Sequence, residues 1–296
     1  MNILITGGSG LLGSRLAIEL SKNHLVTLVS RKKLISINNI KNEFVKEYNQ
    51  TQLAKQDIII HAASPNNMEC DNSEIYKNYI EDTEKLILSS SKNKIKKFIF
   101  TSSTRIYGNN GIGEISENNP IVINDNYSKM KGHIENLLID SSDKLDSSIV
   151  RISNSYGFPV FNNTKCWHLL VMYICKEIVH KNTVRLNSNG LEYKDFVPMN
   201  YVIENIVDIV SGTNETKSNI INICSGNTII VKDFANYLIK KAEQFLDKKI
   251  NLLLNNNKET FNKYNITNNK LKIKFNESYS DIEINKLLKF CKKSFA

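Results

Sequence analysis

Short apolar runs alternate with amphipathic stretches along the first half of this chain. The runs lie at residues 2–6, 25–30, 43–47, 58–63, 97–101 and 148–152. Apolar runs of this length predict strands that are buried on both faces. Between them, apolar residues recur at helical spacing over residues 11–20, 72–93 and 125–142. Strands separated by helices predict an α/β fold with a doubly wound parallel sheet.

The pattern is less regular from about residue 155 onward. Apolar spacing predicts helices at 165–181, 199–211, 231–246 and from Asp281, and short strands at 184–186, 194–197 and 220–224. Residues 255–276 are rich in Asn and Lys, and we expect loops there. The second half is therefore expected to form a smaller, mixed C-terminal lobe.

Glycines cluster between the first strand and the first helix. The residues of this turn are Gly7, Gly8, Ser9, Gly10, Leu11, Leu12 and Gly13. A strand, a glycine turn, a helix and a second strand form the unit that holds a dinucleotide, because the turn must be tight and the pyrophosphate must approach the backbone. The sequence thus predicts a Rossmann domain over residues 1–154, with return segments near 196–224, and a substrate lobe formed mostly by residues 155–296.

The second and fourth strands carry information about the cofactor. An NAD site usually has an acid about 20 residues after the glycines. Here the second strand ends in Ser30, Arg31 and Lys32, and these cations favour the 2′-phosphate of NADP, with NAD as the alternative. The small residues Ala62 and Ala63 follow the fourth strand, where the cofactor ribose can lie against the backbone.

The composition excludes several functional classes. The net charge of +9 is spread along the whole chain rather than gathered in one patch, so we expect no nucleic-acid partner. The five cysteines have no C-x-x-C spacing and predict neither a metal site nor disulfides. No stretch approaches the length of a membrane span. We expect a cytoplasmic protein with no membrane contact.

Two Tyr-x-x-x-Lys motifs occur in the sequence. Tyr127 and Lys131 open the helix that follows the fifth strand, whereas Tyr237 and Lys241 have no such context. A cation one helical turn away favours the phenolate form of a tyrosine, which is needed for proton transfer near neutral pH. Ser103, at the end of the fifth strand, supplies a hydroxyl that can hold a substrate oxygen. We predict Ser103, Tyr127 and Lys131 as the catalytic residues.

Five segments of the chain together resemble the extended short-chain dehydrogenase/reductase family. They are the glycine turn after Thr6 and the segments 101–108, 127–131, 151–157 and 193–197. Members of that branch act on nucleotide-linked sugars as epimerases, dehydratases or ketoreductases. The resemblance implies that Tyr127, Lys131, Ile152 and Ser153 border the cofactor. It also implies that the sugar nucleotide contacts a second set of residues, namely Thr104, Asn154, His168 and Lys194. It further implies a homodimer formed through the helices at 72–93 and 125–142.

Departures from the family pattern narrow the expected reaction. Dehydratases of the family carry an acid pair directly after the catalytic hydroxyl, where this chain has Thr104 and Arg105. The cysteine that some members use for epimerisation before reduction is likewise replaced by Arg105. These differences favour an NADPH-dependent 4-ketoreductase of a nucleotide-linked 4-keto-6-deoxy sugar. The alternatives are a 4-epimerase with tightly bound NAD and, more remotely, a non-catalytic dinucleotide sensor or polyanion-binding protein.

Overall fold

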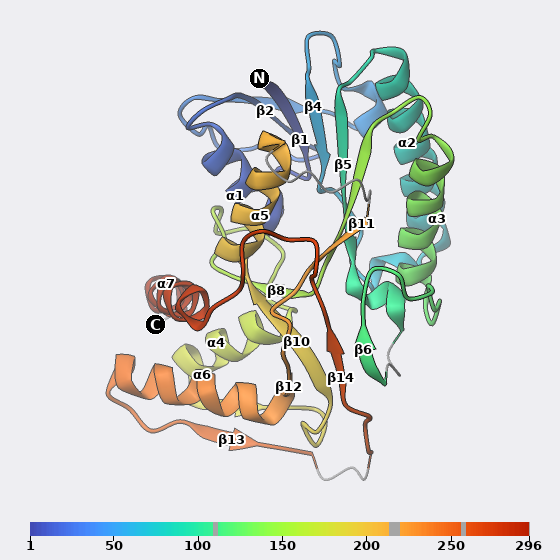
Figure 1. Ribbon diagram of the computed structural model, residues 1–296. Helices are drawn as coiled ribbons and strands as arrows, with labels where there is room; N and C mark the ends of the chain where they lie inside the picture. The colour runs from blue at the N-terminus through green and yellow to red at the C-terminus, as the bar shows by residue number, and fades with distance from the viewer. Residues whose placement is uncertain (109–111, 213–219, 256–258, 296) are drawn as a thin grey trace.

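A seven-stranded parallel sheet forms the centre of the protein in the computed structural model, which describes residues 1–296 except 109–111, 213–219, 256–258 and 296. The strand order is β11-β7-β5-β4-β1-β2-β3 (Figure 1). The strands are β1 (Asn2–Thr6), β2 (Leu25–Ser30), β3 (Ile40–Phe44), β4 (Ile58–His61), β5 (Lys97–Ser103), β7 (Ser147–Ile152) and β11 (Ile220–Ile223). Every neighbouring pair is parallel, which confirms the predicted doubly wound sheet.

Alternate residues of the strands feed two separate hydrophobic cores. Ile3 and Ile5 of β1 belong to one core, and Leu4 between them belongs to the other, as expected for a strand covered on both faces. Helices α1 (Leu11–Leu20) and α5 (Met199–Ser211) cover the first face. Helices α2 (Ser73–Lys92) and α3 (Asn126–Asp140) cover the second, as Figure 1 shows.

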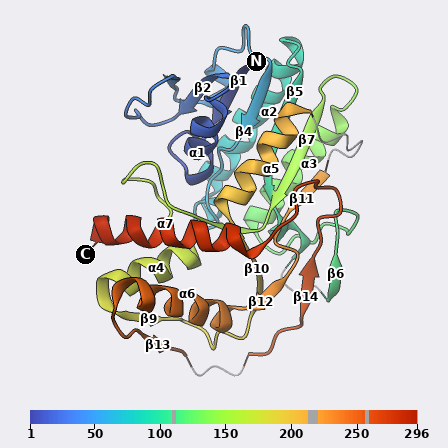
Figure 2. The same ribbon diagram turned by 60° about the vertical axis from the view of Figure 1, so that its left-hand side comes forward.

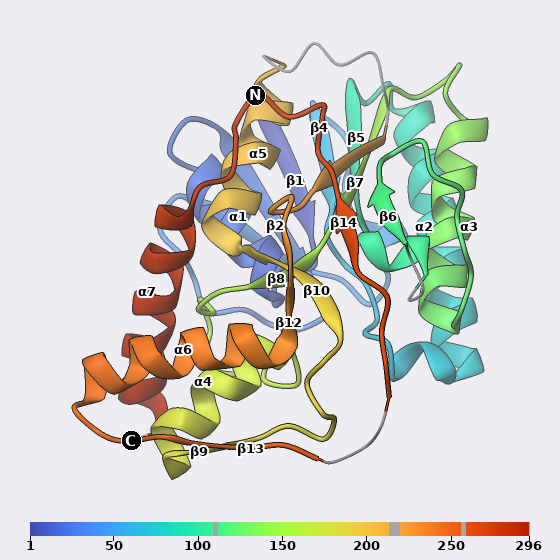
Figure 3. The same cartoon turned by 60° about the horizontal axis from the view of Figure 1, so that its bottom comes forward.

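The smaller lobe lies below the carboxyl edge of the sheet and contains three helices and several short strands (Figures 2 and 3). The helices are α4 (Leu170–Lys181), α6 (Val231–Leu246) and α7 (Glu277–Phe295). A mixed three-stranded sheet joins β8 (Asn154–Tyr156), β10 (Tyr193–Pro198) and β12 (Thr228–Ile230). Two-stranded parallel pairs join β9 (Thr183–Arg185) to β13 (Asn251–Leu253) and β6 (Gly113–Ile115) to β14 (Tyr264–Ile266).

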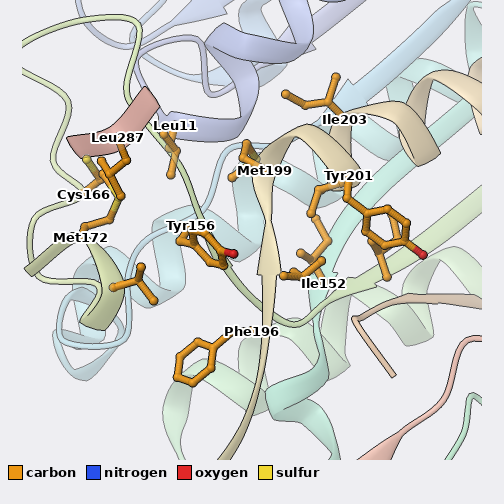
Figure 4. Packing of buried hydrophobic residues seen from close by; sticks show 14 of the residues in the cluster. Leu11, Ile152, Tyr156, Cys166, Met172, Phe196, Met199, Tyr201, Ile203 and Leu287 are labelled. Atoms are coloured by element: carbon orange, nitrogen blue, oxygen red, sulfur yellow. The ribbon is translucent and has the colours of Figure 1, made fainter. Parts of the chain in front are cut away.

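The lobe and the sheet share one of the two cores. Figure 4 shows Leu11 of α1 and Met199 of α5 above Tyr156 of β8 and Phe196 of β10, with Leu287 of α7 at the side. Because this apolar cluster is continuous, the lobe is fixed against the α1 and α5 face of the sheet. None of the described helices is long and apolar enough to cross a membrane.

A buried ion pair reinforces the junction between α1 and α7. Arg15 and Glu283 are 9% and 0% exposed, and both guanidinium end nitrogens donate to the carboxylate. Glu283 also accepts from the backbone N–H groups of Phe158 and Asn200 at 3.2 Å. A Cβ at Gly157 would overlap the Glu283 carboxylate, so a glycine is required where these elements converge.

Three predicted elements have a boundary that differs from the structure by three residues or more. The third strand covers residues 40–44 rather than 43–47, because its partner β2 ends at Ser30, which pairs with Phe44. The helix predicted from residue 165 begins at Leu170, since Leu169 is extended and residues 164–169 form turns. The last helix begins at Glu277 rather than at Asp281. At this earlier start, the Asn276 side chain accepts a hydrogen bond from the backbone N–H of Ser278.

Candidate functional site

The glycine turn connects β1 to α1 at the carboxyl edge of the sheet. Gly7 has φ of +76°, and a Cβ there would lie 2.7 Å from the backbone nitrogen of Ala63. The turn after β1 therefore packs directly on Ala62 and Ala63 after β4. A Cβ at Gly13 would lie 2.5 Å from the Gly7 carbonyl oxygen, so a side chain there would push α1 away from the end of β1.

The start of α1 fits a phosphate-bearing cofactor. Gly10 is its N-cap residue, and within the described residues no side chain caps this end of the helix. The free N–H groups and the positive end of the helix dipole form an anion-binding site. Leu11 is only 9% exposed and packs in the core, so it would contribute its backbone rather than its side chain. Leu12 is half-buried against the same core, and Ser9 is half-buried in the turn.

The end of β2 lies beside this turn, because the Gly8 N–H donates to the Val29 carbonyl at 2.9 Å. Arg31 and Lys32 are both exposed there. The Arg31 guanidinium lies 5.5 Å from the ring centroid of Tyr48, which follows β3. Burial raises the pKa of Tyr48, and the nearby Arg31 charge partly opposes that shift. The predicted cations thus stand at the mouth of the glycine turn.

His61, in β4, is a buried structural residue. It is 0% exposed, and its ring nitrogens contact the hydroxyls of Thr6 at 2.8 Å and of Tyr79 and Thr83 at 3.3 Å. Burial lowers its pKa to about 3, so the ring is neutral and works as a hydrogen-bonding bridge between β1, β4 and α2.

The three predicted catalytic residues come together beyond β5. Ser103 is the last residue of that strand, and its hydroxyl is close enough to Tyr127, in the first turn of α3, to lower the pKa of that phenol. The Nζ of Lys131 lies 5.6 Å from the Tyr127 ring centroid and donates to the Thr101 carbonyl at 2.9 Å. Tyr127 is half-buried, and Lys131 is 2% exposed. The hydroxyls and the ammonium thus lie on the side of the sheet where parallel α/β folds bind ligands.

Burial shifts both titratable groups of this cluster toward their neutral forms. It raises the pKa of Tyr127 to about 12, an effect that the Cys70 thiol reinforces and that Ser103 and Arg105 oppose. Burial also lowers the pKa of Lys131 to about 8. A lysine with this pKa exchanges its proton close to neutral pH, as strongly perturbed groups at functional sites often do.

A buried polar network supports the cluster from behind. The Arg151 guanidinium in β7 donates to Glu135 of α3 at 2.6 Å and to the Tyr107 hydroxyl at 2.9 Å. Tyr107 in turn donates to the Asn222 side chain at 2.7 Å. Sequence reasoning missed this network. Its only signal was the placement of polar residues inside otherwise apolar strands.

The predicted substrate and nicotinamide residues near β7 and β8 occupy different environments. Ile152 pairs directly with Ser103 across β5 and β7. Ser153 is buried, and its hydroxyl donates to the Asp195 carbonyl at 2.8 Å. Asn154 is exposed and donates to that same carbonyl at 2.9 Å. Ser153 is therefore enclosed by the backbone that it bonds, whereas Asn154 remains accessible at the surface.

Lys194 and Thr104 are less open than the sequence suggested. The Lys194 ammonium lies 3.1 Å from the Glu192 carboxylate, and Thr104 is only 7% exposed within a short helical turn, η3 (Thr104–Tyr107). Asp195, next to Lys194, is fully buried and accepts from the Ser225 and Gly226 backbone N–H groups. This segment thus forms a tightly bonded wall between β10 and the loop after β11.

A solvent-open pocket of about 550 Å³ is formed by two segments that are far apart in the sequence. One wall is the connection from β4 to α2, and the other is the turn before α4, which contains His168 and Trp167. The lining residues are Asn66, Met68, Glu69, Asn72, Ile75, Lys165, Trp167 and His168. The first wall rests on α3, since Asn126 donates to Asp71 at 3.0 Å. His168 thus lies in a cavity beside the helix that carries Tyr127, and the residues of the first wall were not predicted from the sequence.

Comparison with known proteins gives a consistent result. A dTDP-D-glucose 4,6-dehydratase of Dictyostelium discoideum is 33% identical over an alignment of 216 positions that covers 55% of this chain and 49% of that protein. An N-acetyl-α-D-glucosaminyl-diphospho-ditrans,octacis-undecaprenol 4-epimerase of Escherichia coli O157:H7 is 26% identical over an alignment of 268 positions that covers 84% of this chain and 73% of that protein. The chain spans about half the length of the dehydratase relatives that it matches.

The fold similarity extends over the whole molecule. The structure of UDP-glucuronic acid 4-epimerase from Bacillus cereus, in complex with UDP-glucuronic acid and NAD, superposes with a TM-score of 0.80 over 99% of both chains at 20% identity. The family model described as the NAD dependent epimerase/dehydratase family matches residues 3–224, which include the glycine turn, the serine–tyrosine–lysine cluster and the seventh strand of the large sheet. The chain therefore belongs to the NAD-dependent epimerase/dehydratase family, in agreement with its resemblance to extended short-chain dehydrogenases.

Proposed function

We propose that this protein is an NAD-dependent 4-epimerase of a diphosphate-linked sugar, most simply a nucleotide sugar. The observation that supports this most is the meeting of Ser103, Tyr127 and Lys131 at the carboxyl edge of the sheet, the same edge that carries the glycine turn. The Escherichia coli relative, matched over 84% of this chain, is a 4-epimerase. A bound nicotinamide would accept and return a hydride at the sugar carbon.

Each residue has a distinct task in this reaction. Tyr127, as the phenolate, takes the proton of the sugar hydroxyl when that carbon is oxidised and returns it when the ketone is reduced. Ser103 donates a hydrogen bond to the same sugar oxygen. Lys131 lies one helical turn from Tyr127, so its positive charge would favour the phenolate, and its ammonium would hold the cofactor ribose. Asn154 would contact the sugar nucleotide near its phosphates, and His168 would border the sugar.

We do not propose water elimination, although two of the relatives are dehydratases. Elimination needs an acid beside the catalytic hydroxyl, and this position holds Arg105, whose charge is engaged with the Asp125 carboxylate at 2.6 Å. A paired guanidinium neither donates nor removes the necessary proton.

Plain ketoreduction with NADPH is the second candidate. It is favoured by Arg31 and Lys32, which are exposed beside the glycine turn and would suit a 2′-phosphate. In that reaction Tyr127 gives its proton once to the developing alkoxide, and the reduced cofactor is consumed. The catalytic cluster would be the same, so the fate of the cofactor distinguishes the two candidates.

One experiment separates them. Purified protein is incubated with UDP- and dTDP-linked hexoses and with 4-keto-6-deoxy sugars, while absorbance at 340 nm and the sugar products are followed. Interconversion of 4-epimers with no net change in cofactor supports the epimerase. Stoichiometric loss of NADPH absorbance with a keto sugar supports the reductase. Cofactor binding with neither reaction would leave a dinucleotide sensor.

We also propose a homodimer in which α2 and α3 form the contact. Leu88 on α2 and Ile139 on α3 are 60% and 43% exposed, and a contact between two copies through these helices would remove both side chains from water. Leu88→Glu should yield a monomer in sedimentation velocity. A wild-type protein that is monomeric at micromolar concentration would contradict the proposal.

A further inference from the structure

Arg105 is bonded to Ser103 and to the residue that caps the helix of Tyr127. Its backbone N–H donates to the Ser103 Oγ at 3.2 Å. Its side chain turns toward the start of α3, where Nε and a terminal nitrogen lie 2.7 and 2.6 Å from one oxygen, Oδ2, of Asp125. One residue therefore bonds to the catalytic serine and to the helix that carries the catalytic tyrosine.

Asp125 divides its two carboxylate oxygens between two tasks. Oδ1 accepts from the Ser128 backbone N–H at 2.7 Å and caps α3, while the Ser128 hydroxyl accepts from the Asp125 N–H at 3.2 Å. Oδ2 is left for Arg105. Burial alone would raise the pKa of Asp125, but hydrogen bonds from Ser128 and Arg105 outweigh it and hold the pKa below the usual value. The carboxylate is thus charged at neutral pH, as the ion pair requires.

We infer that Arg105 and Asp125 are a positioning pair, which fixes the first turn of α3 so that the Tyr127 hydroxyl lies against Ser103. Asp125 precedes Tyr127 by two residues, so a shift of the helix cap moves the phenol. This inference rests on the proposed function of Tyr127. It gives a role to Arg105, which stands where dehydratases of the family have an acid. Displacements of about 1 Å at a reacting centre can reduce rates roughly 100-fold.

The charges of Arg105 and Asp125 also act on the pKa of Tyr127, in opposite directions. Arg105 lowers the pKa of Tyr127, and Asp125 raises it. The other groups facing this phenol are the Cys70 thiol beneath α3, the Tyr79 hydroxyl of α2 and the Lys131 ammonium. These groups are unchanged when either partner of the pair is replaced. The effects of positioning and of charge can therefore be separated. Loss of either partner breaks the ion pair, whereas the pKa of Tyr127 should rise when Arg105 is lost and fall when Asp125 is lost.

The test compares Arg105→Ala, Asp125→Asn, their double variant and Arg105→Lys in the full chain. Asparagine still caps helices, so Asp125→Asn removes the charge and keeps the cap. We expect each single variant to lose roughly 10-fold to 100-fold in kcat with little change in KM, and the double variant to be no worse than the singles. Arg105→Lys should restore part of the loss. Lys241→Ala, which breaks a 2.8 Å pair with Asp281 in the lobe, is the matched control.

The pH profile of kcat/KM gives the readout that a purely structural defect would not move. Its Tyr127 limb should shift to higher pH in Arg105→Ala and to lower pH in Asp125→Asn. A kcat within twofold of wild type for either variant, strictly additive losses in the double variant, or shifts in the same direction would overturn the inference.

A second measurement does not depend on turnover. In protein labelled with [¹³Cζ]tyrosine, the Tyr127 resonance is assigned with Tyr127→Phe and titrated in both single variants. Opposite shifts support the pair even if no sugar is converted, in which case only the proposed function has failed. An unresponsive resonance in an active enzyme overturns the pair alone.

Discussion

Two tyrosine–lysine pairs with the same spacing lie on helices of this chain, and their local geometry is the same. Lys131 lies 5.6 Å from the Tyr127 ring centroid, and Lys241 lies 5.6 Å from the Tyr237 ring centroid. What differs is the third partner. Tyr127 meets the Ser103 hydroxyl at the end of a central strand, whereas Tyr237 donates to the Asp281 carboxylate at 2.6 Å. A motif of five residues therefore acquires its chemistry from the element against which its helix packs.

The carboxylate explains why the second pair is unsuited to proton transfer. Burial raises the pKa of Tyr237, and the hydrogen bond to Asp281 raises it further, since a phenolate there would face a negative charge. Ser103 acts in the opposite sense on Tyr127, because a hydroxyl can donate to a phenolate.

The largest contrast is expected from removal of the phenol hydroxyls. Tyr127→Phe should lower kcat by about 100-fold to 10,000-fold, the usual range for a general acid–base residue, while Tyr237→Phe should leave kcat near that of the wild type. Initial rates with an identified sugar substrate provide the measurement. Equal losses in the two variants would mean that the phenol of α3 has no special role.

The hydrogen-bond partners of the two tyrosines should differ by a smaller factor. Ser103→Ala removes a donor to the sugar oxygen and should reduce kcat by roughly 10-fold to 100-fold. Asp281→Asn breaks an ion pair at the protein surface and should change only stability, by less than about 1 kcal/mol. Rates and urea unfolding of both variants test this. A rate loss confined to Asp281→Asn would reverse the comparison.

Replacement of each of the two lysines by methionine should change the stability of the protein in opposite directions. Lys131 carries a buried charge that burial disfavours, so Lys131→Met should raise the free energy of unfolding at pH 7 by about 1–2 kcal/mol while activity falls. Lys241 is 31% exposed and paired, and its replacement should lower stability slightly. Thermal unfolding at pH 7 is the measurement, and a destabilised Lys131→Met would show that its bond to Thr101 dominates.

The smallest expected effect is the pH dependence of the stability difference between the wild type and Lys131→Met. The pKa of Lys131 is about 8 in the folded state, against 10.5 in the unfolded chain, so folding expels a proton between these values. The penalty is complete below pH 8 and disappears above about pH 10.5. The stability of the wild type relative to Lys131→Met should therefore rise by about 1 kcal/mol per pH unit within that window. A flat difference would mean that folding does not change the pKa of Lys131.

The sequence was sufficient where local pattern and structure depend on the same residues. Apolar runs and the glycine turn identified the parallel sheet, and the position of Tyr127 after β5 distinguished it from Tyr237. The start of α4 could not be predicted, because Trp167 leaves the helical path to pack against Phe295 of α7 at 4.8 Å. The pairing of Arg105 with Asp125 was equally inaccessible, since a cation and an acid 20 residues apart carry no mark of contact.

The ion pair between Arg15 and Glu283 has a consequence for the order of folding during synthesis. The two residues are separated by 268 positions, so α1 leaves the ribosome long before the carboxylate that neutralises its buried arginine. Until then Arg15 stays hydrated, because a buried guanidinium with no partner is strongly destabilising. Nascent chains arrested before α7 should consequently keep the face of α1 open, and the glycine turn and α1 should become protected from proteases only after Glu283 has emerged.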